Sequence, residues 1–96
     1  MKIQKEAVAG TLESSDLLVK VAPNTGLEIV VNSEVNKQFG EQIKKVVTQT
    51  LNDLNVTDGL VIVDDKGALD CAIKARVQCA VLRGANEENL DWSKLL

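Results

Sequence analysis

The sequence predicts an α+β fold, a two-layer sandwich in which two helices cover one face of a small mixed four-stranded sheet, in the order β-β-β-α-β-α. Three patterns predict it. Short runs that alternate apolar and polar residues are typical of strands with one buried face. A stripe of apolar residues spaced three and four apart over residues 35–54 is typical of a helix. An uninterrupted apolar run at residues 60–63 is typical of a strand covered on both faces. With 96 residues, we expect one domain, residues 1–96.

Two alternating runs, at residues 8–12 and 17–21, predict the first two strands, because side chains in an extended chain repeat every second residue. The residues expected on the buried face are Val8, Gly10 and Leu12 in the first strand and Leu17, Val19 and Val21 in the second. The segment between them, Glu13-Ser14-Ser15-Asp16, is polar, and Ser and Asp favour turns because their side chains bond nearby backbone groups. We predict a β-hairpin with Ser14 or Ser15 at its exposed tip, within reach of another protein's active site.

The remaining elements follow a turn at residues 23–26, where Pro and Gly interrupt the pattern. A strand, a long helix and another strand then follow one another, an order that predicts a parallel pair with the last strand inside the sheet. A second helix follows the turn at residues 64–67. The residues expected to face the sheet are Leu27, Ile29 and Val31 in the third strand, Val35, Phe39, Ile43, Val46, Val47, Thr50, Leu51 and Leu54 in the first helix, and Leu69, Ala72, Ile73, Ala80 and Val81 in the second.

Gly40 interrupts the apolar stripe of the first helix. A glycine inside a helix costs about 1 kcal/mol relative to alanine. We expect close packing of this helix against the sheet to be the reason that a glycine stands there.

The composition favours a non-catalytic role. The chain contains no histidine and no tyrosine, so the side chain best suited to acid–base chemistry near pH 7 is missing. A Ser-His-Asp arrangement is therefore impossible, and no motif supports a lysine base. A serine at the hairpin tip is better suited to be the substrate of another enzyme than to be a catalyst.

Charge and hydropathy exclude two classes of partner. The net charge is -3, whereas nucleic-acid binders carry a basic surface. The longest apolar runs fall far short of the roughly 18 residues of a membrane span, and the N-terminal residues lack the apolar stretch of a signal peptide. We expect neither nucleic acid nor membrane among the partners, and a cytoplasmic location.

The cysteines and the carboxylates do not indicate a metal site. Cys71 and Cys79 are eight positions apart in a predicted helix, about 12 Å along its axis, so they cannot bridge and are expected to be small buried thiols. Two cysteines without histidine or a Cys-x-x-Cys pair do not suit zinc. Asp64, Asp65 and Asp70 are explained by capping at a strand end and a helix start.

Several segments carry a resemblance to a known family. They are Ala9-Gly10-Thr11-Leu12-Glu13-Ser14-Ser15-Asp16, Gln38-Phe39-Gly40, Asp64-Asp65-Lys66-Gly67-Ala68-Leu69-Asp70-Cys71, Ala75-Arg76-Val77 and Trp92. Together they closely resemble the acyl carrier (gamma) subunit of citrate lyase. The resemblance covers nearly the whole chain and implies a single acyl-carrier domain.

The resemblance implies a covalent prosthetic group. In this family a serine of the Glu-Ser-Ser-Asp segment carries 2'-(5''-phosphoribosyl)-3'-dephospho-coenzyme A through a phosphodiester, and the matching residue is Ser14. The terminal thiol of the group would carry acetyl and citryl thioesters between the transferase (alpha) and lyase (beta) subunits of citrate lyase. Citrate would thereby be cleaved to acetate and oxaloacetate, and the carrier itself would be non-catalytic. A prosthetic-group transferase would dock on the hairpin and supply the activating base.

Two alternatives to this function stay open. The carrier subunit of malonate decarboxylase has the same prosthetic-group chemistry. A non-catalytic interaction or ligand-sensing domain can have a similar α+β shape, because fold alone does not determine function.

The roles of the residues around the serine also stay open. Glu13 and Asp16 serve either as recognition charges for the transferase or as stabilisers of the turn. Local physics does not choose between the hydroxyls of Ser14 and Ser15, so the assignment of Ser14 comes from the resemblance.

Two arginines are candidate contacts for phosphate. Arg76 and Arg83 are seven positions apart and so share one helical face. They could hold the phosphates of the prosthetic group or an acidic partner surface. A solvated basic face is the other interpretation.

Overall fold

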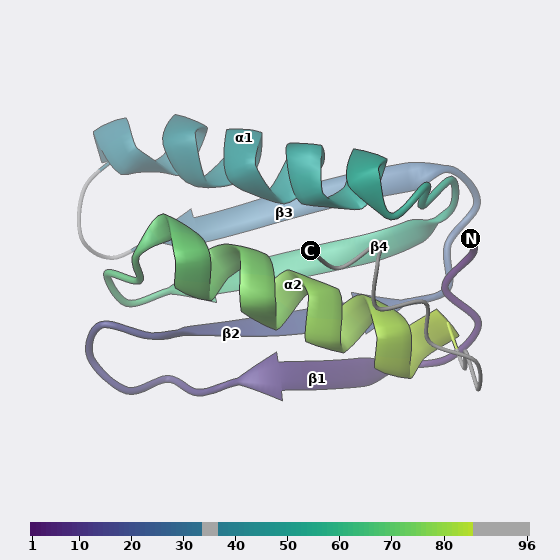
Figure 1. Ribbon diagram of the computed structural model, residues 1–96, viewed down its shortest axis with the longest axis horizontal. Helices are drawn as coiled ribbons and strands as arrows, with labels where there is room; N and C mark the ends of the chain where they lie inside the picture. The colour runs from purple at the N-terminus through teal and green to yellow at the C-terminus, as the bar shows by residue number, and fades with distance from the viewer. Residues whose placement is uncertain (34–36, 86–96) are drawn as a thin grey trace.

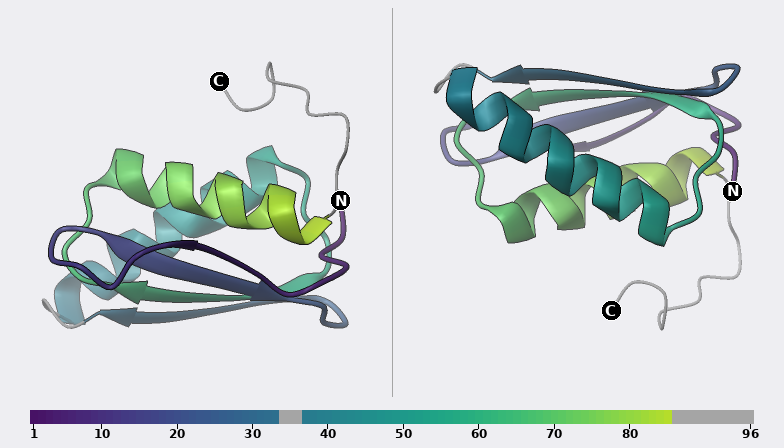
Figure 2. Two further views of the ribbon diagram at one scale, coloured as in Figure 1. Left: turned by 90° about the horizontal axis from the view of Figure 1, so that it is seen from below. Right: turned by 90° about the horizontal axis from the view of Figure 1, so that it is seen from above.

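The structure is a computed structural model that describes residues 1–33 and 37–85, with the backbone alone at residues 37–39. Its elements are β1 (Ala7–Gly10), β2 (Leu17–Ala22), β3 (Leu27–Ser33), α1 (Lys37–Asp53), β4 (Gly59–Asp65) and α2 (Asp70–Ala85). Both helices lie on one face of a four-stranded sheet (Figure 1, Figure 2). The predicted two-layer α+β class is therefore confirmed. Val35, the Phe39 side chain and Trp92 lie outside the described residues.

The sheet is mixed, in the order β1-β2-β4-β3. β1 pairs with β2 and β2 with β4 in antiparallel fashion. β3 and β4, which α1 connects, are parallel. The predictions of a parallel pair and of an interior position for β4 are both confirmed.

The core lies between the sheet and the two helices. α2 packs against β1 and β2, α1 packs against β3, and the helices pack against each other. The largest fully buried side chains are Leu17, Leu51, Ile73, Val19, Val47, Val61, Val63, Val77 and Val81. They include Leu17 and Val19 of the predicted buried face of β2 and Val47 and Leu51 of the predicted stripe on α1.

The predicted buried face of the first strand is wrong. Ala9 is buried and pairs with Val19, whereas Val8 is 48% exposed and faces away from the helices. β1 ends at Gly10, so Leu12 lies beyond it and is also exposed. Helix α2 runs close to this part of the sheet, since a Cβ on Gly84 would come within 2.7 Å of a Val21 methyl. In β1, the small side chain of Ala9 therefore faces the helix and the larger side chain of Val8 does not.

Two expectations about the second helix are wrong. Leu69 is 74% exposed. Its carbonyl accepts the N–H groups of Ala72 and Ile73, so it lies just ahead of the first helical residue and not on the buried face. Cys71, in the first turn of α2, is also exposed, while Cys79 is half-buried, and both are free thiols.

Two packing expectations, one for Gly40 of α1 and one for β4, also differ from the structure. A Cβ added at Gly40 would meet no described atom within 4 Å, so close packing does not account for that glycine. β4 was expected to be covered on both faces. Its alternate residues Leu60 and Ile62 are only half-buried, because the helices cover the other face alone.

Candidate functional site

The predicted hairpin is confirmed, with both serines at its tip. The Thr11 N–H donates to the Leu17 carbonyl at 3.0 Å, which carries the β1–β2 pairing beyond the end of β1. The Asp16 N–H donates to the Glu13 carbonyl at 3.2 Å. That bond closes a four-residue turn in which Ser14 and Ser15 are the central residues.

Gly10 sets the path of the chain into this turn. Its φ is +98°, a left-handed conformation that residues with a side chain avoid. A Cβ at this position would lie 1.9 Å from the Leu17 carbonyl oxygen. The hairpin therefore requires glycine at this point, both for its backbone angle and for the close approach of the second strand.

The turn is fastened to the loop that follows β4. The Ser15 N–H donates to the Lys66 carbonyl at 2.8 Å, and the Lys66 N–H donates to the Asp16 carbonyl at 2.9 Å. These reciprocal bonds extend the β2–β4 ladder, which reaches the pair Leu17 and Asp65. The tip is consequently part of the sheet's end and not an isolated flap.

The loop after β4 is ordered in turn by Asp65. This carboxylate is 3% exposed and accepts hydrogen bonds from the N–H groups of Gly67 and Ala68 and from the Ser33 hydroxyl. Burial of a carboxylate is tolerated when its oxygens are satisfied in this way. Capping of the loop thus explains Asp65, and the described residues contain no cluster of three metal-ligating side chains.

Asp16 is the centre of the side-chain contacts at the tip. The Arg76 guanidinium donates to both carboxylate oxygens, from Nη2 at 2.9 Å and from Nε at 3.3 Å. The Thr11 hydroxyl and the Leu17 N–H donate to the same carboxylate at 3.0 and 2.8 Å. A two-pronged Arg–carboxylate pair fixes orientation as well as distance, so Arg76 ties α2 to the hairpin.

These contacts shift the ionisation of Asp16. The hydrogen bond from Arg76, and next the one from the Leu17 N–H, lower the pKa of the Asp16 carboxyl below its ordinary value. Asp16 is therefore charged at neutral pH and is engaged inside the protein. Of the two roles that the sequence allowed, stabilising the turn is the one that its contacts support.

Arg83 is engaged elsewhere on the same hairpin. Its Nη1 donates to the Val8 carbonyl at 2.8 Å, at the edge of the sheet. Arg76 and Arg83 thus bind the hairpin at two separate points. The Arg76 side chain is still 41% exposed, so it has donors left for a ligand.

The two serines differ in their backbone and not in their exposure. Both are exposed, as is Glu13, and within the described residues neither serine hydroxyl has a hydrogen-bond partner. Ser15 has a φ of +65° and an N–H bonded to Lys66. Ser14 is the first central residue of the turn, and its exposed hydroxyl is available to an approaching enzyme.

Exposed apolar side chains accompany the serines. Leu12, at 57% exposure, lies in the hairpin tip, and Leu69, at 74%, lies in the loop to which the tip is fastened. Sequence reasoning missed this pair because it assigned both leucines to the core. It also missed the contact between Asp16 and Arg76, which are 60 positions apart and so carry no local signal.

The chain is similar to known carrier proteins over almost all its length. Residues 4–84 match the family model described as "ACP: Malonate decarboxylase delta subunit (MdcD)". Proteins named citrate lyase acyl carrier protein are 65% identical in Enterobacter sp. (strain 638), over 99% of both chains, and 65% identical in Pectobacterium atrosepticum, over 99% of this chain and all of the relative. A relative of the same name in Vibrio cholerae is 54% identical over 99% of both chains. The chain belongs to the citrate lyase acyl carrier protein family.

Membership in this family confirms the resemblance drawn from the sequence. It also confirms that the chain is an acyl carrier and not a catalytic subunit. Members of an acyl carrier family bear a covalently attached prosthetic group and work within an enzyme complex. In the described part of the chain, neither helix has the length and hydropathy that a membrane span needs.

Proposed function

We propose that the chain is the acyl carrier subunit of citrate lyase and that the prosthetic group is attached to the Ser14 hydroxyl. One observation carries attachment at this turn: both serines are exposed at a tip that backbone bonds to Lys66 and the contact from Arg76 to Asp16 hold in place. The choice of Ser14 over Ser15 follows the resemblance of the Glu13-Ser14-Ser15-Asp16 segment to the family's segment. A modifying enzyme can therefore reach a hydroxyl on a turn whose backbone is fastened to the rest of the protein.

The residues at the tip fit a phosphodiester-linked group. The Ser14 hydroxyl has no hydrogen-bond partner in the described residues that a modification would disrupt. The remaining donors of Arg76 are at the same end of the molecule, where they suit a phosphate. We propose 2'-(5''-phosphoribosyl)-3'-dephospho-coenzyme A as the group. When bound, it supplies a terminal thiol that carries acetyl and citryl groups.

The carrier's own residues present the group and do not react with it. The sequence holds no histidine and no motif supports a lysine base, so we assign the base that activates Ser14 to the prosthetic-group transferase. The later partners in this proposal are the alpha and beta subunits of citrate lyase. The free thiols of Cys71 and Cys79 suit a reducing compartment, and we expect the carrier to act in the cytoplasm.

One observation favours a second candidate, the carrier subunit of malonate decarboxylase. The family model that matches residues 4–84 is named for a subunit of malonate decarboxylase. The curated relatives at 54 to 65% identity are instead named for citrate lyase, which is why we propose citrate lyase first. Reconstitution with the partner subunits of each complex, assayed with citrate and with malonate, distinguishes the two.

The attachment point is tested by mass spectrometry on matched variants. Wild type, Ser14→Ala and Ser15→Ala are each co-expressed with the modifying enzymes, and the intact mass and the peptide containing the turn are measured. We expect one large adduct on wild type, none on Ser14→Ala, and the adduct retained on Ser15→Ala. Both variants should stay within about 0.5 kcal/mol of wild-type stability, as exposed substitutions usually do.

Two outcomes would count against this proposal. An adduct that persists on Ser14→Ala and vanishes on Ser15→Ala would move the site by one residue. Unmodified wild type, under conditions in which a known citrate lyase carrier is modified, would reject the carrier function proposed for this chain.

A further inference from the structure

The face of the sheet opposite the helices carries an apolar surface that no described part of the chain covers (Figure 2). Strand register aligns Val8, Lys20, Ile62 and Val30 in one row across all four strands. The row beside it on the tip side contains Leu18, Asp64 and Asn32, and the row on the other side contains Ala22, Leu60 and Glu28. We call these three rows the open face.

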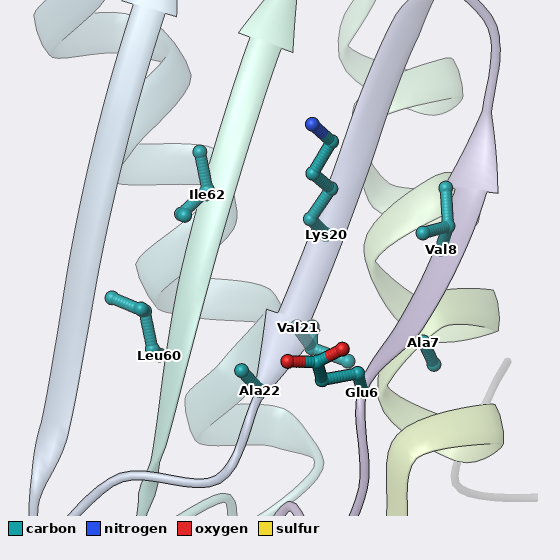
Figure 3. Close-up of a pocket in the computed structure, with 8 residues that line it drawn as sticks. All are labelled: Glu6, Ala7, Val8, Lys20, Val21, Ala22, Leu60 and Ile62. Carbon is teal, nitrogen blue, oxygen red and sulfur yellow. The ribbon is translucent and has the colours of Figure 1, made fainter.

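The open face has a shallow hollow. A cavity of about 310 Å³ lies over β1, β2 and β4, between Val8, Lys20, Ala22, Leu60 and Ile62. Figure 3 shows these side chains on the near side of the sheet, with the helices behind it. The hollow is lined mainly by apolar groups, with the Lys20 ammonium toward one end and the Glu6 carboxylate toward the other.

The composition of the open face is that of a covered surface. In sheets with one solvated face, the outward residues are normally polar. Here β4 carries the apolar residues Leu60 and Ile62 on its outward face before Asp64, both of them are half-buried, and Val30 is 37% exposed. An apolar patch of this kind on a soluble domain typically marks an interaction site.

The charges of the open face indicate what covers it. Lys20 is the single cation in the three rows, is exposed, and has no ion pair within the described residues. Its neighbours along the row, Val8 and Ile62, are apolar. The acids Asp64 and Glu28 lie in the rows on either side, and the acid Glu6 lines the hollow. A complementary surface is therefore apolar, with a carboxylate at its centre and basic groups around it.

A second copy of this chain does not have that surface. Two open faces placed together would bring acids against acids, and neither has a carboxylate in its central row.

We propose that the open face holds the carrier on a larger protein subunit of its complex, one that presents an apolar surface with a carboxylate opposite Lys20. The inference rests on the proposed carrier function. The face lies along the sheet, while the turn between β1 and β2, which contains Ser14, lies at the end of the strands (Figure 1). A partner bound there leaves the hairpin tip free to visit separate active sites.

The test measures binding of the carrier to the purified alpha and beta subunits of the complex. Lys20→Glu and Val30→Asp are compared with Lys44→Glu and Gln49→Asp, which make the same changes of charge at exposed positions of α1. We expect at least tenfold weaker binding for the two open-face variants and wild-type affinity for the two controls, because charge reversal in a desolvated contact is costly. Unfolding midpoints in urea establish that all four variants fold.

Modification of Ser14 is measured separately on each variant, so the two proposals fail in different ways. Open-face variants should receive the same mass adduct as wild type. Wild-type affinity in both open-face variants would overturn the docking inference, even with Ser14 modified. So would absence of binding by wild type, dimerisation of the isolated carrier that Lys20→Glu abolishes, or burial of Lys20 by the carrier's own prosthetic group in the isolated modified protein.

Discussion

Replacing Gly10 with alanine should be one of the most damaging small substitutions in this protein. The left-handed φ of +98° alone costs an alanine about 1 to 2 kcal/mol. The new Cβ would also lie 1.9 Å from the Leu17 carbonyl oxygen, and a backbone atom cannot move aside as a side chain does. The two strands must separate there and weaken the bond from the Thr11 N–H to Leu17, which is worth about 1 kcal/mol.

Together these effects give an expected loss of about 2 to 4 kcal/mol, out of a total stability of about 5 to 15 kcal/mol for a typical domain. The measurement is urea unfolding followed by circular dichroism. Gly40→Ala is the matched control, because the same methyl group there meets no described atom within 4 Å. An alanine inside a helix should stabilise the protein by up to about 1 kcal/mol.

The two substitutions should therefore act in opposite directions. Amide exchange adds a local readout, since the Thr11 N–H should lose protection in Gly10→Ala and keep it in Gly40→Ala. A loss below 1 kcal/mol in Gly10→Ala, with Thr11 still protected, would refute the reasoning. It would mean that the close approach of Gly10 to Leu17 does not exist in solution.

Three further predictions concern the Arg76–Asp16 contact, the core and the thiols. Asp16 has a pKa below its ordinary value of 3.8 in the folded protein, so its pairing with Arg76 contributes stability that is fully present above that pH and is lost as the pH falls through the lowered pKa. Arg76→Met should raise the Asp16 pKa measured by NMR, and an unchanged pKa would contradict the contact between Arg76 and Asp16. Leu51→Ala, at a fully buried position, should cost about 2 to 5 kcal/mol in urea unfolding, and a cost under 1 kcal/mol would contradict the placement of α1. Cys71 should react with a thiol reagent well before Cys79 in the folded protein, and equal rates would contradict their difference in exposure.

The sequence was sufficient to predict the fold class because its strongest patterns are local. The alternation at Leu17, Val19 and Val21 and the stripe containing Val47 and Leu51 each repeat with the period of one element, and all five residues are buried. The interior position of β4 was predictable in the same way from its apolar run. These features depend on which side chains avoid water, and the order of apolar and polar residues along the chain shows that directly.

The first strand was assigned to the wrong face because hydropathy is not the deciding quantity there. Val8 is more hydrophobic than Ala9, yet Ala9 is the buried residue. The close approach of α2, seen at Gly84 and Val21, favours small side chains toward the helix. That spacing depends on elements far apart in the chain, and no alternating pattern reveals it.

At the candidate site, the turn was predictable and its fastening was not. Polar residues between two strands predicted an exposed hairpin tip, with Ser14 and Ser15 on it. The contact from Arg76 to Asp16 and the backbone bonds to Lys66 join segments about 50 to 60 positions apart. Sequence reasoning therefore left Arg76 as either a contact for a phosphate or partner or part of a solvated basic face, and it missed the contact of Arg76 with Asp16.

The reciprocal bonds between the hairpin and Lys66 have a consequence for how this family can diverge. They join backbone groups only, at Ser15, Asp16 and Lys66, so they do not depend on which side chains the neighbouring positions carry. The exposed side chains of Leu12 and Glu13 can then be exchanged in evolution while the height and direction of the turn are inherited. Substitutions at Leu12 and Glu13 alone would then suit the surface to a new modifying enzyme or partner, with no change in how the serine is presented.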